Sequence, residues 1–346
     1  MKRAFLTTLM VIVMIASVSF AACAEESEET PSQTALSLVT GNVGGGLYVA
    51  GVGLGEILNR YAPNIIVTAE ASSGSIRNIE LMEGGFAELA LLSSIDVYES
   101  THGVAPRFEE NLAYSVIMPG HLSVFNRIVR ADSDIETLAD LKGSGAKIWN
   151  YTMTRKYGGV YLADLDNLQK YYDFTDDDIT CVSYYTLGDQ IDAIKESRHD
   201  LISYTTGVPN PTLTDLTTTL DCRFISIEED ILAQMCVDTP FFFPYVMEAG
   251  VYKGQDEPLN MVAYTYFLVV KNELDTDLVY ELVKALCENY DDLAAIHPSL
   301  EDYSTDYLLR NTVAPWHPGA IKYFEEEGVW TSELAALQTE LLAEVG

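Results

Sequence analysis

Positive charge is scarce in this sequence. Lys and Arg together number 20 against 52 Asp and Glu, which gives a formal net charge of −32 over 346 residues. Because a nucleic-acid-binding surface needs clustered cations to contact phosphates, this balance excludes such a domain as the default interpretation. The acidity fits a saline habitat, simple solubility or repulsion of anionic surfaces, so it indicates no particular site.

Histidine and cysteine are also sparse, with five of each. No two histidines have the helical spacing of metal ligands, and the sequence has no G-x-S-x-G or H-E-x-x-H motif. The acidic run 176–178 lacks the glycine and the distal glutamate of an EF-hand. We therefore predict that the protein binds no metal and no cofactor and is not an enzyme. Cys222 and Cys236 are the best-placed candidates for a disulfide, with buried free thiols as the alternative.

Only one apolar run is long, and it lies at the N-terminus. Two cations precede the uncharged run 4–22, which is typical of a secretory signal peptide. The segment 20–23 resembles a bacterial lipobox, in which Cys23 would receive a lipid, whereas 22–24 matches an A-x-A peptidase site. We favour the lipoprotein, because the acidic stretch that follows has the composition of a solvated tether. The expected location is extracytoplasmic, periplasmic or anchored to the membrane through Cys23.

Beyond residue 35 the sequence alternates short β-type runs with helical patterns, which is the signature of an α/β fold with a largely parallel sheet. Runs at 35–40, 64–71 and 87–92 predict a β-α-β-α-β unit. Two further runs, 112–118 and 122–129, precede a second alternation that begins near residue 147, and everything after residue 270 has helical periodicity. Crossovers near residues 130 and 260 therefore predict two α/β lobes joined by two strands, with a cleft and a hinge.

The predicted organisation has four parts. A signal peptide covers 1–22 and an acidic tether covers 23–33. Lobe I combines 34–130 with 261–346, and lobe II covers 131–260.

The glycine-rich loop 39–48 lies between a predicted strand and a predicted helix. Consecutive glycines let backbone N–H groups point outward, and a helix N-terminus adds partial positive charge, so together they favour a carboxylate or phosphate. A tight turn without a ligand is the alternative. The loop lacks the lysine of a P-loop and the spacing of a dinucleotide-binding motif. The candidate ligand-binding residues here are Asn42, Val43, Gly44, Gly45, Gly46 and Tyr48.

Further polar segments follow other predicted strands. In a parallel sheet such strand ends meet at one edge, where α/β proteins bind ligands, although the same hydroxyls also serve as helix caps. A cation in the second lobe is a candidate carboxylate clamp, with a solvated surface charge as the alternative. The candidate residues of these segments are Ser73, Gly74, Ser75, Asn78, Ser93, Arg155, Thr205, Thr206 and Gly207.

Several motifs together resemble the TAXI family of solute receptors of TRAP transporters. The resemblance covers the chain from about residue 35 to about residue 329 and implies a two-lobed fold of the periplasmic-binding-protein type II class. It also implies a receptor that delivers a small organic anion or amino acid, such as glutamate or 2-oxoglutarate, to ion-coupled TRAP membrane subunits. The motifs are the glycine loop, Ser73-Gly74-Ser75 with Asn78, Val129 to Ser133 with Leu138 to Gly143, Gly207 to Pro211, Ala249 to Tyr252 with Gly254 to Asp256, and His317 to Ala320.

Two positions depart from the family pattern. Thr154 to Tyr157 replaces a Gly-Ser-Gly-Thr loop, and Ser93 stands where relatives often have glutamine. Both lie where family members approach the ligand, so we expect the ligand to differ from that of the relatives. The predicted function is capture and delivery of a carboxylate-bearing solute, and the alternative is a binding protein that senses a solute for a membrane signalling partner.

Overall fold

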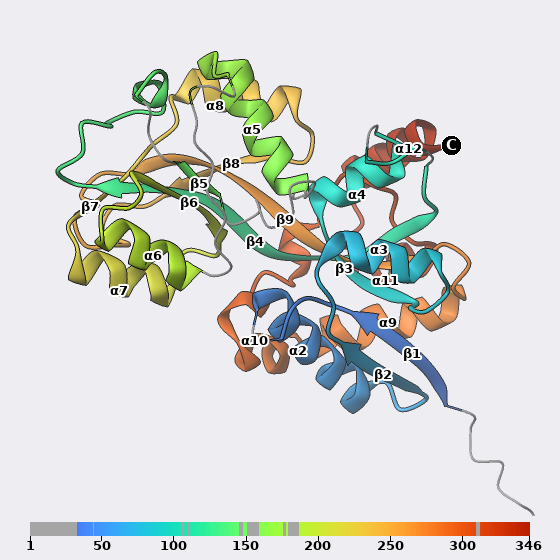
Figure 1. Ribbon diagram of the computed structural model, residues 1–346. Helices are drawn as coiled ribbons and strands as arrows, with labels where there is room; N and C mark the ends of the chain where they lie inside the picture. The colour runs from blue at the N-terminus through green and yellow to red at the C-terminus, as the bar shows by residue number, and fades with distance from the viewer. Residues whose placement is uncertain are drawn as a thin grey trace, which may run out of the picture. The chain divides into compact units, whose positions relative to one another are not determined.

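The computed structural model describes residues 33–346 except for 44, 105–106, 110, 145–147, 151–158, 176–177, 179–186 and 309–311 (Figure 1). The predicted signal peptide, the tether up to residue 32, Cys23, Gly44 and Arg155 therefore lie outside the described residues, as does the strand predicted near residue 180.

A mixed sheet forms the centre of the described chain, in the order β2-β1-β3-β9-β4-β6-β5, with β7 beside β4 and β8 beside β9. The pairs β1/β3 and β5/β6 are parallel, whereas β9 is antiparallel to both β3 and β4. The prediction of a largely parallel sheet is therefore wrong for the middle of the sheet. The strands are β1 Thr34–Val39, β2 Ile65–Glu70, β3 Leu89–Ser93, β4 Tyr114–Arg130, β5 Ile148–Asn150, β6 Leu201–Thr206, β7 Cys222–Phe224, β8 Phe243–Met247 and β9 Leu259–Lys271.

Helices cover both faces of this sheet (Figure 1). The amphipathic helix α9 shows why they do, since it turns Val279, Leu282, Val283 and Leu286 into the core at helical spacing. The helices are α2 Gly46–Tyr61, α3 Ser75–Glu83, α4 Ser94–Thr101, α5 Gly159–Tyr172, α6 Leu187–Lys195, α7 Pro211–Thr219, α8 Glu229–Asp238, α9 Thr276–Glu288, α10 Tyr290–Ile296, α11 Pro318–Glu326 and α12 Ser332–Val345, with short 3-10 helices at Ala139–Leu141, Pro298–Leu300 and Thr305–Tyr307.

The long strand β4 replaces the two shorter strands that the sequence predicts. Its pairing with β9 shifts register between Val116 and Met118 and again between Pro119 and Leu122, so the chain bends at these points without leaving the sheet. The bend is held by Thr265, whose Oγ1 donates to the Gly120 carbonyl at 3.0 Å. The strand therefore continues through the position where a proline and a glycine predict an interruption.

Two clusters of buried apolar side chains support the sheet. The larger one mixes residues of both predicted lobes, for example Leu38 with Leu168 and Phe242. The smaller one lies where β4, β6 and β9 meet α6 and α7, around Val124 and Ile128. The division into two lobes stays a prediction.

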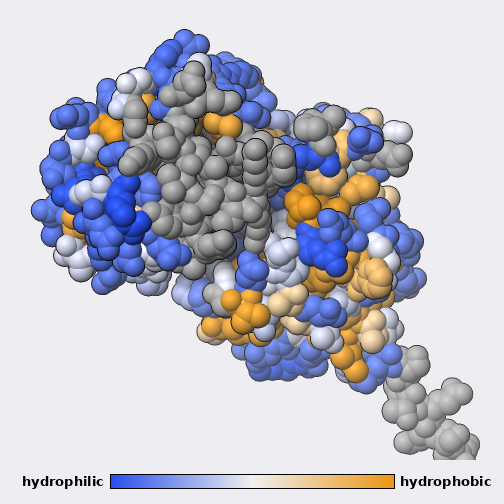
Figure 2. All heavy atoms as spheres, in the orientation of Figure 1, coloured by the Kyte–Doolittle hydropathy of each residue, from blue (hydrophilic) through white to orange (hydrophobic). Residues whose placement is uncertain are grey.

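The described cysteines Cys222, Cys236 and Cys287 are free thiols. The candidate Cys222–Cys236 disulfide is therefore not formed, and burial raises the pKa of both thiols to about 11. Within the described residues no helix is both long and apolar enough to cross a membrane. The face of the molecule in Figure 2 is mostly hydrophilic, with hydrophobic residues gathered over α3 and α4.

Candidate functional site

Asn78 joins the loops that follow β1 and β2. Its buried Nδ2 donates to the carbonyls of Thr40 at 2.7 Å and Leu91 at 2.9 Å, and its Oδ1 accepts from Ser72. The Ser72 amide in turn donates to the Gly41 carbonyl at 3.0 Å, so the glycine loop and the start of α3 lie side by side. The structure thus gives Asn78 a role in positioning these loops.

The two helices that begin at this edge have uncapped N-termini. Gly45 precedes α2 and Gly74 precedes α3, and neither helix has a side-chain cap or an acidic residue in its first turn. The φ of Gly74 is +111°, a conformation that favours glycine. Because the first amides of a helix point outward and carry partial positive charge, two such starts side by side favour an anion.

The glycine loop is open to solvent beside these helix starts. Val43 is 76% exposed, Asn42 and Gly46 are also exposed, and Tyr48 is half-buried. Ser73 is likewise exposed in the neighbouring loop. The predicted residues of the first lobe that are available to a solute are therefore the loop residues, whereas Asn78 lies beneath them.

Ser93 is occupied by protein contacts. It caps α4, because its Oγ accepts from the Asp96 amide at 3.1 Å and donates to Asp96 Oδ2 at 2.6 Å. Its own amide donates to Ser75 Oγ at 3.1 Å. Ser93 therefore connects the start of α4 to the start of α3.

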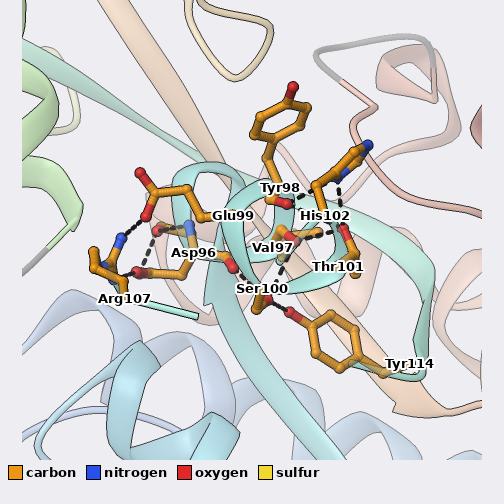
Figure 3. A network of polar contacts seen from close by, with 10 residues as sticks. Asp96, Val97, Tyr98, Glu99, Ser100, Thr101, His102, Arg107 and Tyr114 are labelled. Carbon is orange, nitrogen blue, oxygen red and sulfur yellow. Dashed lines mark hydrogen bonds and ion pairs between the residues drawn. The ribbon is translucent and has the colours of Figure 1, made fainter. Parts of the chain in front are cut away.

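A buried ion network extends from Asp96 (Figure 3). Arg107 Nη2 pairs with Asp96 Oδ1, and Arg107 Nη1 pairs with Glu99 Oε2. The Arg107 side chain is only 7% exposed. Burial raises the pKa of Glu99 to about 7 even though Arg107 favours the ionised form.

A row of aromatic and hydroxyl side chains crosses from β3 toward β6, and we call His121, Thr205, Tyr264 and Tyr266 the hinge row. Tyr266 stands opposite Ser93 in the β3–β9 register. Its hydroxyl lies 3.3 Å from that of Tyr264, which lies 3.2 Å from Thr205 Oγ1. The row connects polar strand ends that belong to the two predicted lobes.

His121 stacks on Tyr266 with ring centroids 4.5 Å apart. It is 8% exposed, and its Nδ1 has no hydrogen-bond partner among the described residues. Burial lowers the pKa of His121 to about 4 and raises that of Tyr264 well above its ordinary value. Both side chains are therefore uncharged near neutral pH.

His121, Tyr264 and Tyr266 were not predicted as site residues from the sequence. The available signal was two tyrosines two residues apart within the apolar run 262–270, which places both on one face of a strand. Of the predicted second-lobe residues, Thr205 joins the hinge row, whereas Thr206 Oγ1 accepts from Asn210 at 2.9 Å. The exposed Gly207 follows them toward α7.

A separate surface hollow of about 240 Å³ lies at the far end of β4, around Arg130, Asp132 and His199. It contains none of the predicted site residues. The described part of the chain contains no group of three side chains that could hold a metal ion.

Residues 38–328 match the NMT1-like family. The chain belongs to this family. Among solved structures, it is similar to the XAC2383 protein of Xanthomonas citri bound to ATP, at 12% identity and a TM-score of 0.50 over 91% of this chain and 100% of that chain. It is also similar to the periplasmic aliphatic sulphonate binding protein SsuA of Escherichia coli, at 14% identity and a TM-score of 0.48 over 90% of this chain and 86% of that chain.

At 12% identity the likeness to XAC2383 shows the fold alone. The predicted α/β fold of the periplasmic-binding-protein type II class is confirmed for this NMT1-like protein.

Proposed function

We propose that this NMT1-like protein is an extracytoplasmic solute receptor of the TAXI type. It captures a small carboxylate-bearing solute, an amino acid, a dicarboxylate or an oxo acid, and delivers it to the membrane subunits of a TRAP-type secondary transporter. It performs no chemical turnover. The observation that carries this proposal is the pair of adjacent helix N-termini, α2 and α3, that lack both a side-chain cap and a first-turn acid.

The solute's carboxylate binds at the glycine loop, where Asn42 to Gly46 and Ser73 to Ser75 offer backbone amides and hydroxyls. Tyr48 borders it. The other end of the solute meets the hinge row. Thr205 to Gly207 and Arg155 engage it from the second lobe.

Delivery depends on a closed form that differs from the open one. The two predicted lobes, 34–130 with 261–346 and 131–260, approach each other when the solute contacts both, and binding stabilises that form through its higher affinity for the solute. A lipid on Cys23 keeps the receptor near its transporter.

Gly46 offers a sharp test of the anion site. A side chain there meets open space, because no atom lies within 4 Å of its Cβ position. Gly46→Glu places an acid in the first turn of α2, which stabilises the helix by about 0.3–1 kcal/mol but repels an anionic solute. Gly46→Gln has nearly the same shape without the charge.

The measurement is thermal shift and calorimetry with L-glutamate, 2-oxoglutarate and succinate. A solute at 100 times its Kd adds about 2.7 kcal/mol to the free energy of unfolding. We expect Gly46→Glu to weaken binding at least about tenfold and Gly46→Gln to retain it. Equal binding by both variants would show that the anion does not bind at the start of α2. If the wild type bound none of the three solutes, the proposed ligand class would be wrong.

A further inference from the structure

Arg107 lies at one end of a chain of polar contacts that reaches the proposed solute site. It is 7% exposed and contacts two carboxylates three residues apart on α4, those of Asp96 and Glu99 (Figure 3). Its guanidinium also lies 5.4 Å from the ring centroid of Phe108. A buried cation with two ionic partners has a fixed geometry, because moving it would leave a buried carboxylate without its countercharge.

The chain continues from Asp96 to α3 in two steps. Arg107 pairs with Asp96 Oδ1, and Asp96 Oδ2 accepts a hydrogen bond from Ser93 Oγ at 2.6 Å. The Ser93 amide then donates to Ser75 Oγ at 3.1 Å. Ser75 is the first residue of α3, so the orientation of Arg107 is transmitted by hydrogen bonds to a helix start in the proposed site.

We propose that Arg107 is a positioning residue for the solute site, acting through Asp96 and Ser93 on Ser75, and that the charge of Glu99 regulates it. This inference rests on the proposed function.

Glu99 lies on helix α4, and this helix also contacts the second predicted lobe. Ser94 Oγ donates to the Phe241 carbonyl at 3.0 Å, and the ring of Tyr98 lies 5.6 Å from that of Phe241. Asp166 of α5 acts electrostatically on Glu99 and disfavours its ionised form. The charged groups that face Glu99 are thus Arg107, Asp96 and Asp166.

One arginine offsets one of the two α4 carboxylates. While Glu99 is protonated, Asp96 and Arg107 neutralise each other. Ionisation of Glu99 adds a negative charge that faces Asp166 and opposes the approach of α5 to α4. Since the pKa of Glu99 is raised to about 7, we expect solute affinity to decrease as the pH rises through 7.

The test measures the Kd of the full mature protein for 2-oxoglutarate and L-glutamate at pH 6 and pH 8. We expect the wild type to bind several-fold more weakly at pH 8, and Glu99→Gln to bind equally at both values. Arg107→Met should bind about tenfold more weakly at both pH values, and Arg107→Lys should recover part of the loss. Arg60→Met is the matched control, since Arg60 is exposed and pairs with Glu56.

Arg107→Met that is folded and binds with unchanged Kd would overturn the inference. If that variant does not fold, Asp96→Asn breaks the same chain with an isosteric side chain, and an unchanged Kd there would overturn it as well. A wild type that binds neither solute would contradict the proposed function itself, which separates the two failures.

Discussion

His121 is the side chain through which acid should act most directly on stability. Its pKa is lowered to about 4 in the folded protein by burial, whereas an unfolded chain takes up this proton near pH 6.5. Between these values the unfolded state binds more protons, so the free energy of unfolding falls as the pH decreases. The full shift corresponds to roughly 3 kcal/mol.

His121→Phe keeps an aromatic ring on Tyr266 but removes this titration. We expect urea denaturation to show that the stability difference between pH 7 and pH 5 is smaller in the variant by about 2 kcal/mol. The same pH dependence in both proteins would show that His121 is charged in the folded state or is not buried.

The role of a polar side chain was harder to predict than its position. Small polar residues after successive strands predicted that Ser75 and Ser93 lie at one edge of the sheet, and the Ser93 amide does contact Ser75 Oγ, although β1 lies between their strands. The sequence could not show that Asn78 meets the Thr40 and Leu91 carbonyls, because that depends on the spacing between strands. Tyr264 and Tyr266 were missed since an apolar run is typical of a core strand, and their hydroxyls find partners only across strands.

The bend of β4 depends on Gly120. A Cβ there would lie 2.8 Å from the Tyr266 carbonyl oxygen and 2.8 Å from the Tyr303 hydroxyl. We expect Gly120→Ala to lower the free energy of unfolding by about 1–3 kcal/mol, because backbone on one side cannot move away. Gly207→Ala is the control, as its nearest neighbour would be the Leu122 carbonyl oxygen at 3.9 Å. Similar stability of the two variants, measured by urea denaturation, would contradict this packing.

Elements with strong periodicity were predicted within a few residues. The first three strands and the helices α3, α9, α11 and α12 follow from alternation or helical spacing, because each turns one apolar face inward. The helices α4 and α8 were not predicted. α4 begins directly after β3 with no intervening loop, so the boundary between Ser93 and Ser94 has no turn residues to mark it.

Charge repulsion should act on the whole molecule. The formal net charge is −32, and folding brings these negative charges closer together than they are in the unfolded chain. Raising NaCl from 0.05 to 0.5 M shortens the screening length several-fold, and we expect the Tm to rise by roughly 5 °C. Sucrose of equal osmolality is the control. A Tm that stays flat or falls with NaCl would show that attractive ion pairs outweigh the repulsion.

The order of the strands could not be predicted from local pattern. Alternation correctly indicated the α/β class, whereas the crossovers between lobes near residues 130 and 260 stay a prediction. It could not show that β9 inserts antiparallel between β3 and β4, because that pairing joins segments far apart in the chain.

That central position of β9 has a consequence for how the chain acquires its structure. Until residue 271 has been synthesised, β3 and β4 have no partner between them, so the middle of the sheet stays open while most of the polypeptide already exists. Contacts of such long sequence separation slow folding, since a large loop must close before they form. A nascent chain whose central strand pairs form this late in synthesis therefore remains unfolded for longer.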